Sequence, residues 1–310
     1  MDEVLTQTKF DILRTRLSPT ALAISQTSKE KAEDLLAKSD FPTRKNEAWK
    51  YTNVNGLNKL LLEKKSSDFT NPINITKSTD KIHIINGQVS KDQIDVAGIK
   101  TSWNNLPELH TEDPFDALNL LYCTAALELT FEDADDKVIE LVFENTLDTA
   151  IFPRIFIKGK KNTKGSVILN FQGTEKNASF INVSTYVDVE ENAHLSIYKI
   201  QKNGLETFDL QREYVNQATN SVFTMNTFPL SGRMTRNDLT INVNGSNCET
   251  FMNGAYTLKG KSHCDNHTTV DHKVAHCYSK ELYKGVIDDR ATNVFNGKVF
   301  VRKDAQKINA

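Results

Sequence analysis

Residues 181–189, Ile-Asn-Val-Ser-Thr-Tyr-Val-Asp-Val, carry an apolar or β-branched side chain at every second position. Successive side chains of an extended strand point to opposite faces, so this pattern predicts a strand with one buried face. The same period begins near Lys137 and recurs in four further runs, residues 138–143, 167–171, 239–243 and 299–301. We therefore predict that the C-terminal half of the chain consists mainly of short strands.

Turn-forming residues separate these runs. They are Gly173, Glu191-Asn192, Asn203-Gly204, Ser231-Gly232, Asn244-Gly245, Lys259-Gly260 and Asn296-Gly297. The chain has 29 asparagines, 19 of them from Asn145 onward, and asparagine tolerates the left-handed backbone that repeated corners require. Short strands with frequent turns are typical of a sandwich, a barrel or a β-solenoid, and the period leaves all three open. No short repeat is visible, which argues against a regular left-handed solenoid.

The N-terminal part lacks this alternation and carries helix-capping and proline signals, which predict helices and irregular connections. Thr27-Ser-Lys-Glu30 has the pattern of a capping box and predicts a helix that starts at Thr27 and stops before Phe41-Pro42. A second helix is predicted at Asp113-Pro114, because Asp113 can accept from first-turn amides and Pro114 lacks an amide that would need a partner. Residues 81–87 predict a short strand that enters a turn.

Length and charge set the broad class. The chain has 310 residues, with 38 Lys and Arg against 40 Asp and Glu, so its formal net charge is -2. This balance provides no global field that would attract nucleic acid. A chain of this size lies near the length at which one core divides into two. We predict two domains, a helical region with short strands at residues 1–135 and a β core at residues 136–310.

The sequence also contains features that predict the cellular location of the protein. No stretch approaches the roughly 20 consecutive apolar residues of a membrane span, and the first residues show no basic-then-apolar signal pattern. The four cysteines, Cys123, Cys248, Cys264 and Cys277, are widely spaced. These features predict a cytoplasmic protein with free thiols.

The motifs of several common enzyme classes are absent from the sequence. It contains no G-x-x-x-x-G-K-[ST], no G-x-G-x-x-G after a strand, no H-E-x-x-H and no G-x-S-x-G. These absences argue against a nucleoside triphosphatase, a dinucleotide enzyme, a zincin and a hydrolase with a nucleophile elbow.

One segment, residues 262–278, concentrates metal-ligand chemistry. It holds four of the seven histidines and two of the four cysteines, and imidazole and thiolate are ligands for zinc, iron or copper. One hypothesis is a metalloenzyme with His272, His276 and Cys277 as candidate ligands, in which the ion activates water or oxygen. Residues 263–272, if extended, would point His263 and His267 to one face, and Cys264 and His272 to the other. We therefore favour a strand and turn whose polar groups bond to neighbouring strands.

The segment Phe41-Pro-Thr-Arg-Lys-Asn-Glu-Ala-Trp-Lys-Tyr-Thr52 mixes basic and aromatic residues. Such a mixture can stack on nucleic acid. The alternative is a capped helix entry in which Trp49 and Tyr51 pack while Arg44, Lys45 and Lys50 remain solvated. The net charge of the whole chain favours this alternative.

Five blocks in order along the chain resemble the SufB/SufD family of the Suf iron–sulfur cluster assembly machinery. They are Phe41–Thr52, Asp113–Asn119, Asp265–Ser279 with Leu282–Val286, Phe295–Val301 and Asp304–Ala310. The early Trp-Lys-Tyr-Thr block favours the SufD branch. The resemblance implies a mainly β fold, with a right-handed parallel β-helix core preceded by an N-terminal α-helical region.

The resemblance also implies a function. SufD-like proteins are non-catalytic scaffold subunits that pair with a SufB-like subunit, dock a SufC-like ATPase and support iron acquisition and cluster assembly. It implies no cofactor bound by this chain alone, and an iron–sulfur cluster or iron only together with the SufB-like partner. Besides the metalloenzyme, the remaining alternative is a β-solenoid adhesin or carbohydrate-binding module, which would require a secretion signal.

This sequence departs from the family pattern in one respect. It stops at Ala310, whereas family members run on through a Cys-Ser-His-Gly motif and a C-terminal helical subdomain that docks SufC. The resemblance therefore implies a truncated chain without that docking region and assigns no metal ligand by position. A β-helix cut within its array exposes unpaired backbone groups. We expect an open edge near residues 295–302, covered by the SufB-like partner or by a second copy of the chain.

Overall fold

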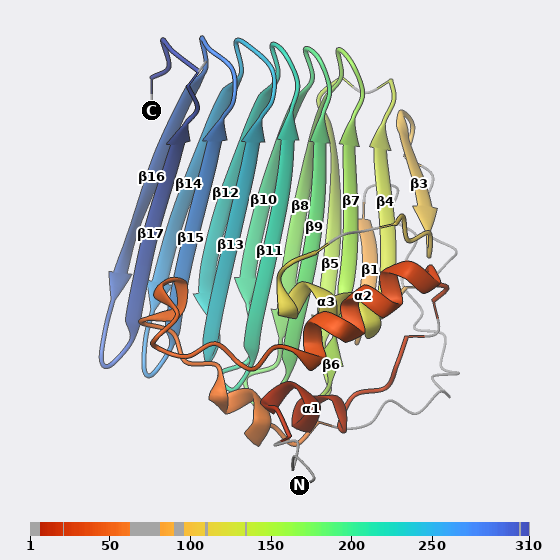
Figure 1. Ribbon diagram of the computed structural model, residues 1–310, viewed down its shortest axis with the longest axis vertical. Coiled ribbons are helices and arrows are strands. Elements are labelled where there is room, and N and C mark those ends of the chain that lie inside the picture. The colour runs from red at the N-terminus through yellow and green to blue at the C-terminus, as the bar shows by residue number, and fades with distance from the viewer. Residues whose placement is uncertain are drawn as a thin grey trace, which may run out of the picture.

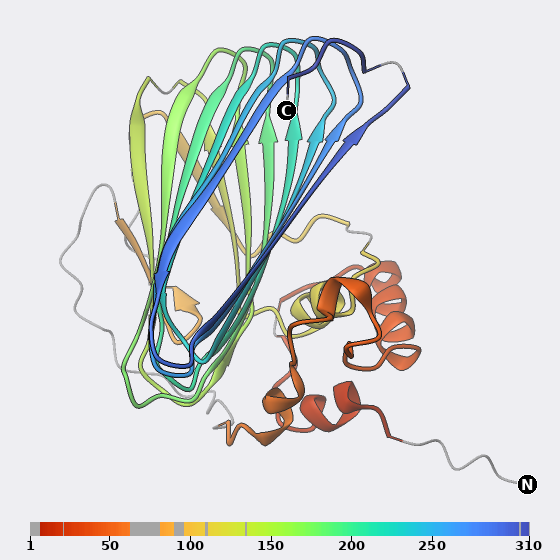
Figure 2. The same ribbon diagram turned by 90° about the vertical axis from the view of Figure 1, so that its left-hand side faces the viewer.

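A parallel β-helix of about six coils dominates the computed structural model. The structure describes residues 7–20, 22–62, 81–89, 96–108, 111–133, 135–303 and 305–309. Each coil contributes one strand to each of two facing sheets, and short helices lie against the outside of one sheet (Figures 1 and 2). The predicted fold class, a right-handed parallel β-helix behind an N-terminal helical region, is confirmed.

The two sheets take alternate strands of the chain. Sheet A contains β1 (Lys81–Ile85), β2 (Gln88–Val89), β5 (Lys137–Asn145), β8 (Lys164–Gly173), β10 (His194–Lys202), β12 (Val222–Ser231), β14 (Glu249–Leu258) and β16 (Tyr278–Ile287). Sheet B contains β3 (Ile99–Trp103), β4 (Ala125–Phe131), β7 (Pro153–Gly159), β9 (Phe180–Val189), β11 (Phe208–Gln217), β13 (Met234–Val243), β15 (His263–His272) and β17 (Thr292–Val301), and β6 (Ala150–Ile151) pairs with β9. The β1–β2 and β3–β4 pairs are antiparallel, and the coils stack in parallel.

Stacking of the coils puts like residues above one another inside the β-helix. His194 of β10 pairs with Lys164 of β8 and with Val222 of β12. The register with β8 holds along β10, and the register with β12 shifts only between Gln201 and Lys202. Phe143 and Phe171 stack with ring centroids 4.5 Å apart. The alternation predicted for residues 181–189 is confirmed in β9, whose inward apolar side chains are buried in the core of the β-helix. Burial of these side chains from successive coils supplies the main driving force for the fold.

Asparagines at one row of corners explain the composition of the C-terminal half. Asn162, Asn192, Asn220 and Asn247 have φ of 64°, 57°, 59° and 56°, the left-handed region that asparagine tolerates. The Asn192 side-chain amide donates to the Asn162 side-chain oxygen of the coil before it (3.0 Å), and Asn247 donates to Asn220 (3.1 Å). His276 occupies the same kind of corner one coil later, with φ of 64°.

The turn predicted at Asn296-Gly297 is wrong, because both residues lie inside β17. A Cβ on Gly297 would lie 2.6 Å from Oε2 of Glu281, so glycine here makes room for a carboxylate inside the β-helix. The glycine marks a close approach of two side-chain layers and not a change of chain direction.

The helical layer contains α1 (Lys9–Arg14), α2 (Gln26–Ala37), α3 (Pro114–Leu121) and two 3₁₀ turns, η1 (Glu47–Trp49) and η2 (Asn55–Lys59). The predicted start of α3 is confirmed: Asp113 Oδ1 accepts from the amides of Phe115 (2.8 Å) and Asp116 (3.0 Å). The predicted start of α2 is wrong. Its cap is Ser25, whose hydroxyl accepts from the Ser28 amide (3.2 Å), so Thr27 lies inside the helix. Within the described ranges, no helix has the length and hydropathy that a membrane span requires.

Two apolar cores lie side by side. One fills the β-helix. The other joins the helices to the outside of sheet B and includes Phe10, Phe115 and Phe180, with the Phe10 and Phe115 rings 5.0 Å apart. The sheets also include β1, β3 and β4, which precede residue 135. The division at residues 135 and 136 stays a prediction.

Candidate functional site

The predicted metal ligands lie in different environments. His272 is buried at the end of β15, with Nε2 3.0 Å from the Ser279 hydroxyl, and burial lowers the pKa of this imidazole. Cys277 is buried, and its Sγ lies 3.3 Å from the Gly245 carbonyl oxygen. His276 is exposed at its corner. Among the residues that the structure describes, no group of three or more His, Cys, Asp or Glu side chains could hold a metal ion.

The predicted division of faces in residues 263–272 is confirmed. Cys264 and His272 point into the β-helix and are fully buried, and His263 and His267 lie on the outer face of sheet B. Burial raises the pKa of the Cys264 thiol to about 12. This thiol is therefore un-ionised at neutral pH and a poor nucleophile.

Asp265 is the centre of a buried cluster on the outer face of β15. Its carboxylate accepts from Arg236 and Thr52, and it lies 2.8 Å from Nε2 of His267. Burial opposes ionisation of Asp265, but the His267 hydrogen bond and the Arg236 charge hold its pKa below its usual range. The Thr52 hydroxyl donates to Asp265, and it lies 2.8 Å from Nε2 of His263. It therefore accepts from an Nε2–H of that imidazole.

This cluster fixes the basic and aromatic segment to sheet B. The Arg236 guanidinium lies 3.9 Å from the centre of the Trp49 ring and donates to the Ala48 carbonyl (2.9 Å). The expected helix entry is the 3₁₀ turn η1, with Trp49 packed. Tyr51 is 66% exposed, so the expectation that it packs is wrong. Residues 47–53, called the strap below, thus join the N-terminal region to the last coils.

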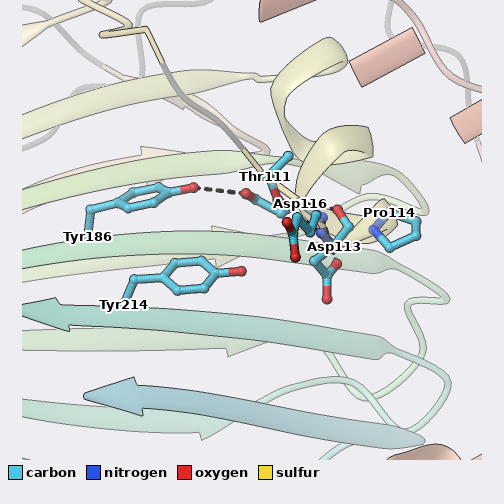
Figure 3. Close-up of a pocket in the computed structure, with 7 residues that line it drawn as sticks. Thr111, Asp113, Pro114, Asp116, Tyr186 and Tyr214 are labelled. Atoms are coloured by element: carbon cyan, nitrogen blue, oxygen red, sulfur yellow. Dashed lines mark hydrogen bonds between the residues drawn. The ribbon is translucent and has the colours of Figure 1, made fainter. Parts of the chain in front are cut away.

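A second cluster holds α3 on sheet B and lines a pocket of about 620 Å³ (Figure 3). The Asp116 carboxylate accepts from the Tyr186 hydroxyl (2.9 Å) and the Ser184 hydroxyl (2.6 Å), and it pairs with Arg154 (2.9 Å). Asp113 pairs with Arg212 (2.9 Å). Burial opposes ionisation of Asp116, but the Arg154 charge holds its pKa below its usual range. Asp113, Asp116 and Tyr186, which line this pocket, are therefore already used in attaching the helix.

The interior of the β-helix is polar along part of its length, which the sequence reasoning missed. Lys199 and Glu213 form an ion pair of 2.5 Å, and both are fully buried. Asp209 accepts from the side-chain amides of Gln201 (2.8 Å), Asn203 (2.8 Å) and Gln211 (3.0 Å). The sequence does contain a signal for the buried lysine. Lys199 lies two positions after Ile197 and four after Leu195, so in a strand it points to the same, inward face.

We expect Asp209 to make stability fall as the pH rises from about 4 to about 6. Burial raises the pKa of Asp209 to about 6, against about 3.9 in an unfolded chain. Between these values the folded state holds more protons, so the free energy of unfolding falls with rising pH, by roughly 3 kcal/mol over the window. The carboxylates of Asp116 and Asp265, whose pKa values are lowered, have the opposite effect at lower pH.

The measurement is urea unfolding of the parent chain and of Asp209→Asn from pH 4 to pH 7. Asparagine does not titrate, so the variant should gain stability relative to the parent as the pH rises. A difference between the two proteins that is the same at every pH would exclude this role of Asp209.

Comparison with known proteins supports the family resemblance seen in the sequence. Residues 142–310, more than half of the chain, match the family model of the SUF system FeS cluster assembly SufBD core domain. The chain is 22% identical over 294 residues to the iron–sulfur cluster assembly protein SufD of Escherichia coli, covering 88% of this chain and 69% of SufD. It is 21% identical over 331 residues to a SufBD family iron–sulfur cluster assembly protein of Synechocystis, covering 95% of this chain and 73% of that protein. The chain therefore belongs to the SufBD family of SUF-system iron–sulfur cluster assembly proteins.

Proposed function

We propose that this chain is a non-catalytic scaffold subunit in iron–sulfur cluster assembly, and that it pairs with a SufB-like subunit through its last coil. The observation that supports the pairing is the exposure of inward-facing apolar residues in β17. Phe295, Val299 and Val301 are 42%, 49% and 51% exposed. Their in-register neighbours in β15 are Asn266, Val270 and His272, which are all fully buried.

The geometry of the last coil suits the addition of another β-helical layer. Within the described residues, β17 pairs with β15 alone. β16 pairs with β14 and, on its other side, only with Asn309 at Tyr278. This end of the β-helix faces the viewer in Figure 2. Edge strands present backbone donors and acceptors that another chain can pair with. A partner with the same coil shape would satisfy these groups and cover the apolar interior at once.

The structural use of the two buried polar clusters also supports a scaffold role. Asp116 and Asp265 are committed to buried contacts that attach the helices and the strap to sheet B. In this proposal, iron or the growing cluster is cargo held at the junction with the SufB-like subunit. A SufC-like ATPase then acts on the assembled complex, and this chain supplies shape and attachment.

Val299→Lys should weaken binding to the SufB-like subunit of the same organism by at least about 100-fold, because it would place an unpaired charge at a dry junction. Binding is measured by surface plasmon resonance or by co-purification. Val138→Lys is the matched control, because Val138 of β5 is equally exposed (48%) far from the last coil. Unchanged binding by Val299→Lys would refute the assigned surface. Light scattering of the chain alone distinguishes pairing with a second copy.

A further inference from the structure

A small pocket outside the β-helix lies where the strap meets the N-terminal ends of β11, β13 and β15. Its volume is about 330 Å³. Phe208 and Met234 form an apolar part of the lining and are 7% and 3% exposed. They are in-register neighbours in β11 and β13, and Met234 is in turn the neighbour of His263 in β15. Phe208 and Met234, called the floor of the pocket below, are therefore held in position by the pairing of the strands in sheet B.

The rest of the lining is basic and polar. Arg233 and Lys261 line the pocket together with His263, Tyr51 and Asn53. Among the described lining residues there is no Asp or Glu. His263 is held by Thr52 of the strap, with Nε2 2.8 Å from the hydroxyl, so the position of its ring is fixed from the side of the strap.

The two cations of the pocket differ from a group of paired lysines at another corner of the β-helix. Lys158 and Lys160 pair with Glu190, and Lys161 pairs with Glu191. Arg233 and Lys261 have no side-chain hydrogen bond or ion pair with any residue that the structure describes. Two like charges that share a concave site without a counter-charge repel each other, and an anion relieves this repulsion.

We propose that this pocket binds a phosphate group. The two uncompensated positive charges match the charge of about -1.5 to -2 that a phosphate monoester carries at neutral pH. A guanidinium fork and a lysine point charge are the usual protein partners of phosphate oxygens. The Tyr51 hydroxyl and the Asn53 amide supply neutral donors, and the floor of Phe208 and Met234 can contact an apolar part of the carrier molecule. This site is independent of the pairing surface at the last coil.

The test is titration of the full chain with inorganic pyrophosphate by isothermal calorimetry, at fixed ionic strength. Saturable binding of one equivalent is expected. Arg233→Gln and Lys261→Gln should each weaken it about 10-fold, and the double variant should abolish measurable binding, because charge-assisted hydrogen bonds are lost. Lys259→Gln is the matched control, since Lys259 is an exposed lysine in the same turn that does not line the pocket. It should change affinity less than twofold.

Circular dichroism and thermal unfolding of each variant establish that the fold is intact. The proposal is overturned if the parent chain binds no pyrophosphate at millimolar concentration, or if Lys259→Gln weakens binding as much as Lys261→Gln. It is also overturned if citrate or an acidic peptide binds the pocket more tightly than pyrophosphate, because the site would then recognise carboxylates. Pyrophosphate binding by the parent chain, together with unchanged SufB-like binding by Val299→Lys, would support this proposal and refute only the scaffold surface.

Discussion

Glu213→Ala is expected to lower the free energy of unfolding by about 3–5 kcal/mol, the usual cost of removing one partner of a buried ion pair. Its partner Lys199 is fully buried inside the β-helix. Without the carboxylate, the ammonium group would either remain charged and unpaired in the buried interior or lose its proton. Both alternatives destabilise the folded chain.

Urea unfolding followed by circular dichroism measures this effect. Glu191→Ala is a matched control, because Glu191 pairs with Lys161 at the surface, where the two side chains are 47% and 54% exposed. Surface pairs of this kind contribute about 1 kcal/mol or less. A similar small loss for both variants would show that water reaches the Lys199–Glu213 pair.

A double replacement separates two contributions to the free energy of unfolding: the penalty for leaving one buried charge unpaired, and the net stabilisation by the ion pair itself. Lys199→Met with Glu213→Leu removes both charges and retains most of the volume. Replacement of a buried pair by apolar residues is often neutral or stabilising. We therefore expect the double variant to recover most of the stability that Glu213→Ala loses, and a loss as large as that of the single variant would contradict this explanation.

Individual strands, helix starts and corners of this protein could be predicted from the sequence, because each depends on residues that are close together in the chain. The alternation in residues 181–189 defines β9, and the capping residues of α3 lie next to the residues they cap. The corner at Asn192 was also predicted from the sequence, because a left-handed backbone favours asparagine. The choice of a β-helix over a sandwich or a barrel came from the resemblance, since the period alone does not specify which strands stack.

The candidate sites depend on contacts between distant residues, which local patterns do not contain. Thr52 and Asp265 are separated by 213 positions and meet only because the strap crosses the last coils. The histidines of residues 262–278 are close in sequence, but an extended strand sends neighbouring side chains to opposite faces. The residue types of this segment alone suggest metal ligands, whereas the strand separates His263 and His267 from Cys264 and His272.

Asp116→Ala is expected to detach the helical layer from the β-helix and to cost about 3–5 kcal/mol. Asp116 and Arg154 are 1% and 0% exposed, so the variant leaves a buried guanidinium without its counter-charge. The hydroxyls of Ser184 and Tyr186 lose their acceptor at the same time. Because α3 packs on both α2 and β9, loosening of α3 should spread into the helices before it reaches the coils.

Hydrogen exchange measured by mass spectrometry can locate this loss. In Asp116→Ala, the amides of α2 and α3 should exchange faster by a factor of 100 or more, while those of β13 and β15, which Asp116 does not contact, retain their protection. Asp34→Ala is the control within the same layer, because its i,i+4 pair with Lys38 is exposed and contributes less than about 1 kcal/mol. If exchange rose equally in the helices and in β13, Asp116 would stabilise the β-helix as a whole. The two apolar cores would then unfold as one cooperative unit.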